Sequence, residues 1–318
     1  MKWIFIVLAV VFLVEGKTQD YPAKPIRLIV PVAAGGNQEI TARAVAEEMS
    51  KGLGQQIVVE SRPSSSALVG TQLVAHAAPD GYTLIAVSTT FARAPVLVKA
   101  AGYDAVRDFA GISLVSRIPL VLVVNPAVPA KSVAELIALA KAKPGELSYG
   151  TSGLGSTGHV AQEVFNRAAG IRMLHVPYKG NAQSLIDVLG GQIQVMFDQL
   201  STSLPHVRSG KLRALGVSSR TRSPLIPDVP TIDESGLPGF EDVTWNAFLA
   251  PAGTPKPIID KLHREIARAV AVPALRARFL ERAIELTASK SPEEFSAYVK
   301  SEVGSFAKLA KELDLKAE

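Results

Sequence analysis

The feature that most constrains the fold is an alternation of short apolar runs with helical segments, which occurs in two successive series. Runs such as IRLIVP at 26–31 are compact and apolar, which is typical of strands buried on both faces. The order strand, helix, strand predicts mostly parallel sheets with right-handed crossovers. The predicted strands are 26–31, 56–60, 82–87, 118–124, 147–149, 172–177, 193–197 and 212–217, and the predicted helices include 40–53, 69–78, 133–142, 158–169, 182–189 and 258–270.

Length and composition exclude several protein classes. The chain has 318 residues, enough for about two domains, and 47% of them are hydrophobic against 20% charged, which excludes a disordered, collagen-like or coiled-coil chain. Aromatic residues make up 6%, and the 34 basic and 29 acidic residues are interspersed without a basic block. We therefore expect no nucleic-acid partner. Zero cysteines exclude disulfides, thiol catalysis and thiolate metal sites.

The N-terminus indicates export. Lys2 precedes an unbroken apolar run from Trp3 to Val14, which has the length of a signal-peptide core and is too short to cross a membrane. We predict a signal peptide over residues 1–16; the alternative is a buried N-terminal helix. No later stretch is long and apolar enough to span a bilayer, so we expect a soluble mature protein in the periplasm.

Two glycine-bearing loops are the strongest candidate sites. In each half a strand enters such a loop and a helix follows, first at Pro31–Gly36 and then at Thr151–Gly158. Helix N-termini carry unpaired N–H groups and the positive end of the helix dipole, so both loops are suited to anions. Two such loops facing each other would hold one small anion. The alternative is that the glycines only permit tight turns.

The second loop also matches the dinucleotide fingerprint, with glycines at 153, 155 and 158. That fingerprint requires an acidic residue about twenty positions later, and the corresponding strand ends in VPYK at 176–179. We therefore expect no cofactor. The five histidines show no metal-ligand spacing, so we expect no metal. His159 could act as a general base, pack at a helix start or donate to a ligand. Asp198 could face a ligand or lie in solvent at a strand end.

Nine segments in order resemble the substrate-binding proteins of tripartite tricarboxylate transporters, the Bug family of bacterial periplasmic receptors. The resemblance spans nearly all of the mature chain. The segments are YPAKPIRLIVP at 21–31, AAGGNQEITAR at 33–43, PDGYTLI at 79–85, YDAVRDFAGIS at 103–113, YGTSGLGSTGH at 149–159, VPYKGNAQSL at 176–185, GGQIQVMF at 190–197, PDVPTIDESGLPG at 227–239 and APAGTPKPI at 250–258.

The resemblance implies a two-lobed periplasmic-binding-protein fold of type II character, with a small carboxylate bound in the cleft between the lobes. Candidate solutes are dicarboxylates, tricarboxylates and aromatic acids. The lobes would close about a hinge and the receptor, a monomer, would hand its solute to membrane permease subunits. We expect one domain from residues 20–120 and 246–318 and the other from 121–245, joined by two crossing strands.

The resemblance also implies a set of ligand-binding positions. The two loops would hold the ligand carboxylate, Ser88 and Thr89 would face the ligand, and the turn at 178–180 with Asp198 would contact its distal end. The predicted site residues are Val32, Ala34, Gly35, Gly36, Glu39, Ser88, Thr89, Thr151, Gly155, Ser156, Thr157, Tyr178, Lys179, Gly180 and Asp198.

Two departures from the family pattern leave alternatives open. Glu39 stands where the family has Asp, and SRPSSSA at 61–67 replaces a glycine-rich stretch. Losing those glycines forbids or penalises positive φ, so we expect a different loop there. The principal hypothesis is a carboxylate receptor that is not an enzyme. The alternatives are a secreted enzyme of the same fold with His159 as base, and a ligand-free sensor.

Overall fold

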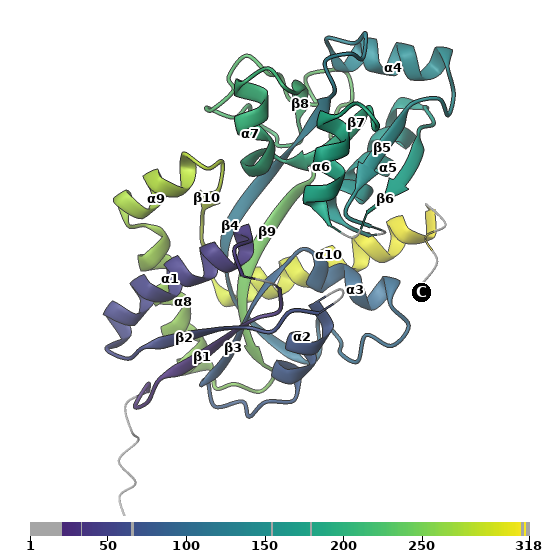
Figure 1. The fold of residues 1–318 in the computed structure, drawn as a ribbon. Helices are drawn as coiled ribbons and strands as arrows, with labels where there is room; N and C mark the ends of the chain where they lie inside the picture. The colour runs from purple at the N-terminus through teal and green to yellow at the C-terminus, as the bar shows by residue number, and fades with distance from the viewer. Residues whose placement is uncertain are drawn as a thin grey trace, which may run out of the picture.

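The computed structural model describes residues 21–32, 34–64, 67–153, 155–178, 180–312 and 315. The chain forms two α/β lobes joined by long strands, as Figure 1 shows. This confirms the two-lobed fold expected from the sequence. The predicted signal peptide at 1–16 lies outside the described residues. Among the described residues, no helix is both long enough and apolar enough to cross a membrane.

The first lobe is built on a parallel sheet with β1 at its centre. β1 pairs in parallel with β2 on one side and with β3 on the other, as the strand–helix–strand pattern predicts. Helices from both ends of the chain cover this sheet. The elements are β1 (Ile26–Val30), α1 (Asn37–Leu53), β2 (Ile57–Ser61), α2 (Leu68–Ala75), β3 (Thr83–Ser88), α3 (Thr90–Leu97), α8 (Lys256–Val270), α9 (Pro273–Leu280), β10 (Glu285–Leu286) and α10 (Pro292–Glu312).

The second lobe repeats this plan with a shorter sheet. β5 pairs in parallel with β6 and with β7, and the helices lie on both faces. At the start of α4, Ser132 accepts a hydrogen bond from the Glu135 N–H and so caps the helix predicted over 133–142. The elements are α4 (Val133–Ala142), β5 (Ser148–Thr151), α5 (Thr157–Ala169), β6 (Leu174–Pro177), α6 (Asn181–Leu189), β7 (Val195–Gln199), α7 (Leu200–Arg208) and β8 (Arg213–Val217).

Two antiparallel strands, β4 (Phe109–Val124) and β9 (Val243–Pro251), connect the lobes. β4 pairs with β9 over 109–119 and then with β7 and β8 from Leu120 or Val121 onward, so a single strand of 16 residues belongs to both sheets. β9 also pairs with β3 at the first-lobe end. We had predicted only 118–124 as a strand in this region, and β9 was not predicted.

Each lobe has a hydrophobic core on both faces of its sheet. In the first lobe, α1, α8 and α9 cover one face, and α2, α3 and α10 contribute to the other. In the second lobe, α4 and α5 cover one face, and α6 and α7 the other. Burial on both faces explains why the strands are continuous apolar runs. Because helices cover both faces of each sheet, polar loops can face the opposite lobe only at the ends of the strands.

Helix α10 extends from the first lobe to the second (Figure 1). Its first half buries Phe295 and Val299 against the first-lobe sheet, and its second half packs Phe306 against Val160 of α5. The Arg167 guanidinium of α5 pairs with the Glu312 carboxylate at 3.1 Å. The lobes are therefore in contact through a helix as well as through the two strands.

The loop before α2 differs from expectation. Ala67 has φ of +61°, so it keeps a left-handed conformation that we had expected the loss of glycines to penalise. Ser64 contributes by accepting a hydrogen bond at 2.9 Å from the Val69 N–H, which satisfies one donor of the first helical turn. The serine-rich segment therefore caps α2 rather than disrupting its start. Residues 65 and 66 lie outside the described part of the chain.

Candidate functional site

The candidate site lies at the carboxyl ends of the parallel strands, where helices begin. In the first lobe β1 leads into α1 and β3 into α3; in the second, β5, β6 and β7 lead into α5, α6 and α7. The helix starts at Gly36, Gly180 and Gln199 have no side-chain cap, so their first N–H groups remain available to a ligand. We call these helix starts and the two predicted loops the interlobe site.

Direct contacts bring the two halves of the interlobe site together. The Asn37 amide at the start of α1 donates to Gln199 Oε1 at 2.6 Å and to Ser201 Oγ at 2.8 Å, both in the second lobe. Gln199 in turn donates at 3.4 Å to Thr244 Oγ1 on β9. The sequence analysis missed these residues. The only available signal was that Asn37 and Gln199 each end a strand-to-helix turn, and their pairing across 162 positions has no local signature.

The first-lobe loop is open to solvent. Ala34, Gly35 and Gly36 are exposed and Val32 is half-buried. Glu39 is buried, and its carboxylate accepts the Gly35 N–H at 3.3 Å and pairs with the Arg43 Nε at 2.5 Å. Glu39 is therefore engaged within its own lobe, where it holds the turn. The cationic Arg43 offsets its charge, which would otherwise oppose an anion.

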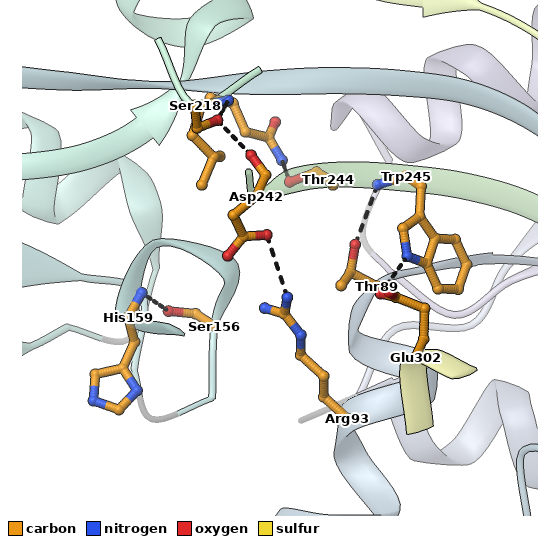
Figure 2. A network of polar contacts seen from close by, with 11 residues as sticks. Thr89, Arg93, Ser156, His159, Ser218, Asp242, Thr244, Trp245 and Glu302 are labelled. Atoms are coloured by element: carbon orange, nitrogen blue, oxygen red, sulfur yellow. Dashed lines mark hydrogen bonds and ion pairs between the residues drawn. The ribbon is translucent and has the colours of Figure 1, made fainter. Parts of the chain in front are cut away.

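The second-lobe loop is organised by its own side chains. The Thr151 hydroxyl is buried, accepts the Gly153 N–H at 3.1 Å and lies 2.7 Å from His175 Nε2. Ser156 caps α5 by accepting the His159 N–H at 3.3 Å (Figure 2). The side-chain oxygens of Thr151 and Ser156 thus hold the loop. In the described structure the backbone N–H groups of Thr157 and Gly158, at the start of α5, are left without a protein acceptor.

Packing accounts for two of the three glycines in the dinucleotide-like pattern. A Cβ on Gly158 would lie 2.5 Å from the Phe197 carbonyl oxygen, so glycine lets α5 approach β7 closely. Gly155 has φ of +70°, and a Cβ there would overlap Leu97 Cδ1 of α3. Leu97 belongs to the first lobe, so Gly155 marks a further point of contact between the lobes.

The remaining predicted positions differ in their exposure to the interlobe site. Thr89 is buried, and its hydroxyl accepts the Trp245 N–H at 3.1 Å, while the half-buried Ser88 pairs with Asn246 on β9. Tyr178 donates to the Asp187 carboxylate at 2.5 Å, which together with desolvation raises the pKa of Tyr178 to about 12. Gly180 starts α6 without a side-chain cap, and Lys179 lies outside the described residues.

Asp198 is buried, which excludes the alternative that it lies in solvent at a strand end. It is 1% exposed, and its two oxygens accept hydrogen bonds from Asn181 Nδ2, the Gln199 N–H, Thr202 Oγ1 and Ser203 Oγ at 2.5–2.7 Å. Burial raises the pKa of Asp198, and these hydrogen bonds oppose the rise. The carboxylate joins the starts of α6 and α7 to the end of β7.

His159 does not have the geometry of an exposed general base. Its ring is 3% exposed, and Nδ1 accepts the Gly155 N–H at 3.2 Å. Burial, with further contributions from His175 and Arg93, lowers the pKa of His159 to about 4. Nδ1 is thus occupied by a backbone donor. This observation removes the specific support for the enzyme hypothesis.

Comparison with known proteins identifies the family. Residues 41–315 match the model of the tripartite tricarboxylate transporter family receptor. The protein BugT of Bordetella pertussis (strain Tohama I) is 35% identical over 301 residues, which cover 93% of this chain and 91% of BugT. This chain belongs to the tripartite tricarboxylate transporter receptor family. The resemblance found in the nine sequence segments is thereby confirmed.

Solved structures of similar receptors share the fold. Rhodopseudomonas palustris Rpa4515, determined with adipate, matches with a TM-score of 0.83 at 34% identity, covering 94% of this chain and all of the other. MatC from Rhodopseudomonas palustris, determined with bound malate, matches with a TM-score of 0.78 at 30% identity and covers 91% of this chain and 99% of the other.

A buried charge cluster lies where the receptor's β9 leaves the second lobe (Figure 2). Arg93 of α3 contacts the Asp242 carboxylate at 3.4 Å, and Trp245 Nε1 donates to Glu302 of α10 at 3.2 Å. Burial raises the pKa of Asp242 to about 6, and Arg93 opposes that rise. The cluster connects α3, β9 and α10, so a change in the angle between the lobes would alter its contacts.

Proposed function

We propose that this receptor captures a small carboxylate between its lobes in the periplasm and delivers it to the permease of a tripartite transporter. The observation that carries the proposal is the convergence of uncapped helix N-termini from both lobes on the interlobe site. Backbone N–H groups at such ends, together with the helix dipole, favour a carboxylate. The adipate and malate bound by similar receptors support this ligand class.

The mechanism follows from the two crossing strands. β4 and β9 carry the backbone from one lobe to the other, so a small change in their twist alters the distance between the loops. A carboxylate that contacts both lobes binds the closed arrangement more tightly and shifts the population toward it. The Asn37–Gln199 hydrogen bond adds a contact that exists only when the lobes are close.

A charge introduced at one helix start tests the ligand class. Thr157→Asp places a carboxylate at the first position of α5, where it would compete with the carboxylate of the solute. A negative charge at a helix N-terminus is compatible with the helix dipole, so the helix itself should not be destabilised. Ala168→Asp, at the opposite end of the same helix on an exposed position, is the matched control. Affinity for malate or adipate, measured by calorimetry, should fall at least about tenfold in Thr157→Asp and stay near the unsubstituted value in Ala168→Asp.

Native mass spectrometry of the exported protein, purified without denaturant, identifies any retained solute. A retained acid or a thermal shift with a dicarboxylate supports the proposal. An empty protein that shows no shift across dicarboxylates, tricarboxylates and aromatic acids contradicts it and favours the ligand-free sensor.

A further inference from the structure

Two imidazoles lie directly behind the second-lobe loop, at a place that solute capture does not by itself require. His159 occupies the first turn of α5 and His175 lies on β6, with ring centroids 4.4 Å apart. Tyr149 of β5 stacks on His175 with ring centroids 4.9 Å apart. The three rings form a stack between the loop and the body of the lobe. We call them the ring stack.

The hydrogen bonds to the loop determine which imidazole nitrogen carries a proton. Gly155 can donate its N–H to His159 Nδ1 at 3.2 Å only if Nδ1 has a free lone pair, so the ring is neutral with its hydrogen on Nε2. The Thr151 hydroxyl, which already accepts the Gly153 N–H, lies 2.7 Å from His175 Nε2. Both ends of the loop are therefore attached to the ring stack.

Given the carboxylate-binding function proposed above, we propose that His159 is a positioning residue whose neutral imidazole holds the second-lobe loop in its ligand-binding shape. Nδ1 fixes the Gly155 N–H and, with it, the direction of the Thr157 N–H at the start of α5. Protonation at Nδ1 turns the acceptor into a donor and places two N–H groups against each other. The loop must then move, and the affinity for an anionic solute falls as the pH falls.

Burial is the main cause of the low pKa of His159, and the neighbouring charges act in the same direction. Arg93 of α3 and His175 of β6 both disfavour an imidazolium, and Asp242 beside Arg93 offsets part of the arginine charge. The Glu163 carboxylate of α5 faces Tyr149, which donates to it at 2.5 Å. Burial also lowers the pKa of His175, against the opposing effect of Glu163.

The sign of the linkage follows from these pKa values. The pKa of His159 is about 4 with the loop in place and about 6.5 for a free imidazole. Between these values the released loop binds a proton that the ordered loop does not. Ordering of the loop is therefore fully favourable above pH 6.5 and is progressively lost as the pH falls toward 4.

Two substitutions at His159 separate its role as a hydrogen-bond acceptor from its ability to take up a proton. In His159→Asn the side-chain oxygen can accept the Gly155 N–H but does not titrate, whereas His159→Phe removes the acceptor. At pH 7 we expect the adipate affinity of the Asn variant to lie within about threefold of that of the unsubstituted protein. At pH 5 we expect the affinity of the Asn variant to be higher by about fivefold or more. The Phe variant should lose about tenfold at both values. His76→Asn, at an exposed histidine of the first lobe, is the control and should change nothing.

Comparing the proteins at the same pH cancels the titration of adipate itself. If the adipate affinity of His159→Asn depends on pH in the same way as that of the unsubstituted protein, the proposal is overturned. It is also overturned if nitrogen NMR shows that His159 carries a proton on Nδ1 at pH 7. If the unsubstituted protein binds no carboxylate at any pH, the proposed function fails instead. The proposal then rests on hydrogen exchange of the Gly155 amide, which should accelerate at pH 5 and in His159→Phe but not in His159→Asn. Equal exchange in all of these overturns it.

Discussion

The two glycine-bearing loops occupy equivalent places in their lobes, each between a parallel strand and a helix, but they are built differently. In the first-lobe loop Ala34, Gly35 and Gly36 are exposed, and the Gly35 N–H donates a hydrogen bond to the Glu39 carboxylate. The second-lobe loop, residues 151–157, is tied by Thr151, Ser156 and the ring stack. One half of the site is therefore preorganised and the other can adapt when the lobes close.

This difference assigns the two lobes different parts in binding. A loop held by buried hydrogen bonds loses little conformational entropy when a ligand arrives, so it contributes affinity. An open loop loses more, but it can adjust to solutes of different length. We expect substitutions in the second-lobe loop to cost both stability and affinity, and substitutions in the first-lobe loop to have small effects.

Gly158→Ala should cause a large loss of stability. The added Cβ would lie 2.5 Å from the Phe197 carbonyl oxygen, which is backbone and cannot rotate away. Overpacking of this kind costs about 1–3 kcal/mol, and only part is recovered from the better helix propensity of alanine. Chemical denaturation measures the loss. The control is Gly180→Ala, where no atom lies within 4 Å of the added Cβ and φ is extended; a similar loss there would contradict the packing argument.

Gly155→Ala should weaken binding more than it weakens the fold. Its Cβ would overlap Leu97 Cδ1 of the first lobe, so it opposes the close arrangement of the lobes as well as straining a positive φ. We expect adipate affinity to fall about tenfold. Leu97→Ala removes the overlapping atoms, so the double variant should recover the part of the loss that comes from lobe contact. An absence of any recovery would show that backbone strain alone is responsible.

The sequence predicted the architecture because burial imposes a pattern on single residues. Each of the eight predicted strands corresponds to a strand of the described structure. The clearest predictions, such as β1 and β3, are apolar because the sheet is covered on both faces there. α3 and α7 were not predicted because each is short and contains a proline, Pro95 or Pro205, which normally indicates a helix end. β9 was missed because polar Thr244 and Asn246 interrupt its apolar run, and their partners lie on distant strands.

The candidate site was less predictable from the sequence for a related reason. The glycine loops follow from local rules, since a strand that enters a Gly-rich turn before a helix places unpaired N–H groups at the helix start. The number of donors around Asp198 and the acceptor role of His159 depend on which side chains the fold brings together. Neither has a local signature. A strand-end acid looks the same in sequence whether four donors surround it or none do.

The smallest effect on stability is expected for Glu39→Gln, which is paired with Thr151→Val so that one polar group is removed from each loop. Thr151→Val deletes a buried hydroxyl and leaves the Gly153 N–H without its acceptor, which costs about 1–3 kcal/mol. Glu39→Gln keeps an acceptor for the Gly35 N–H and loses only the pair with Arg43, whose side chain is 57% exposed, so it costs about 0.5 kcal/mol. Denaturation in urea gives both values. If the two variants lose equal stability, the loops are equally ordered and the second lobe is not the preorganised half. Because Glu39→Gln also removes a negative charge near the interlobe site, its affinity for adipate should stay level or rise, whereas that of Thr151→Val should fall with its stability.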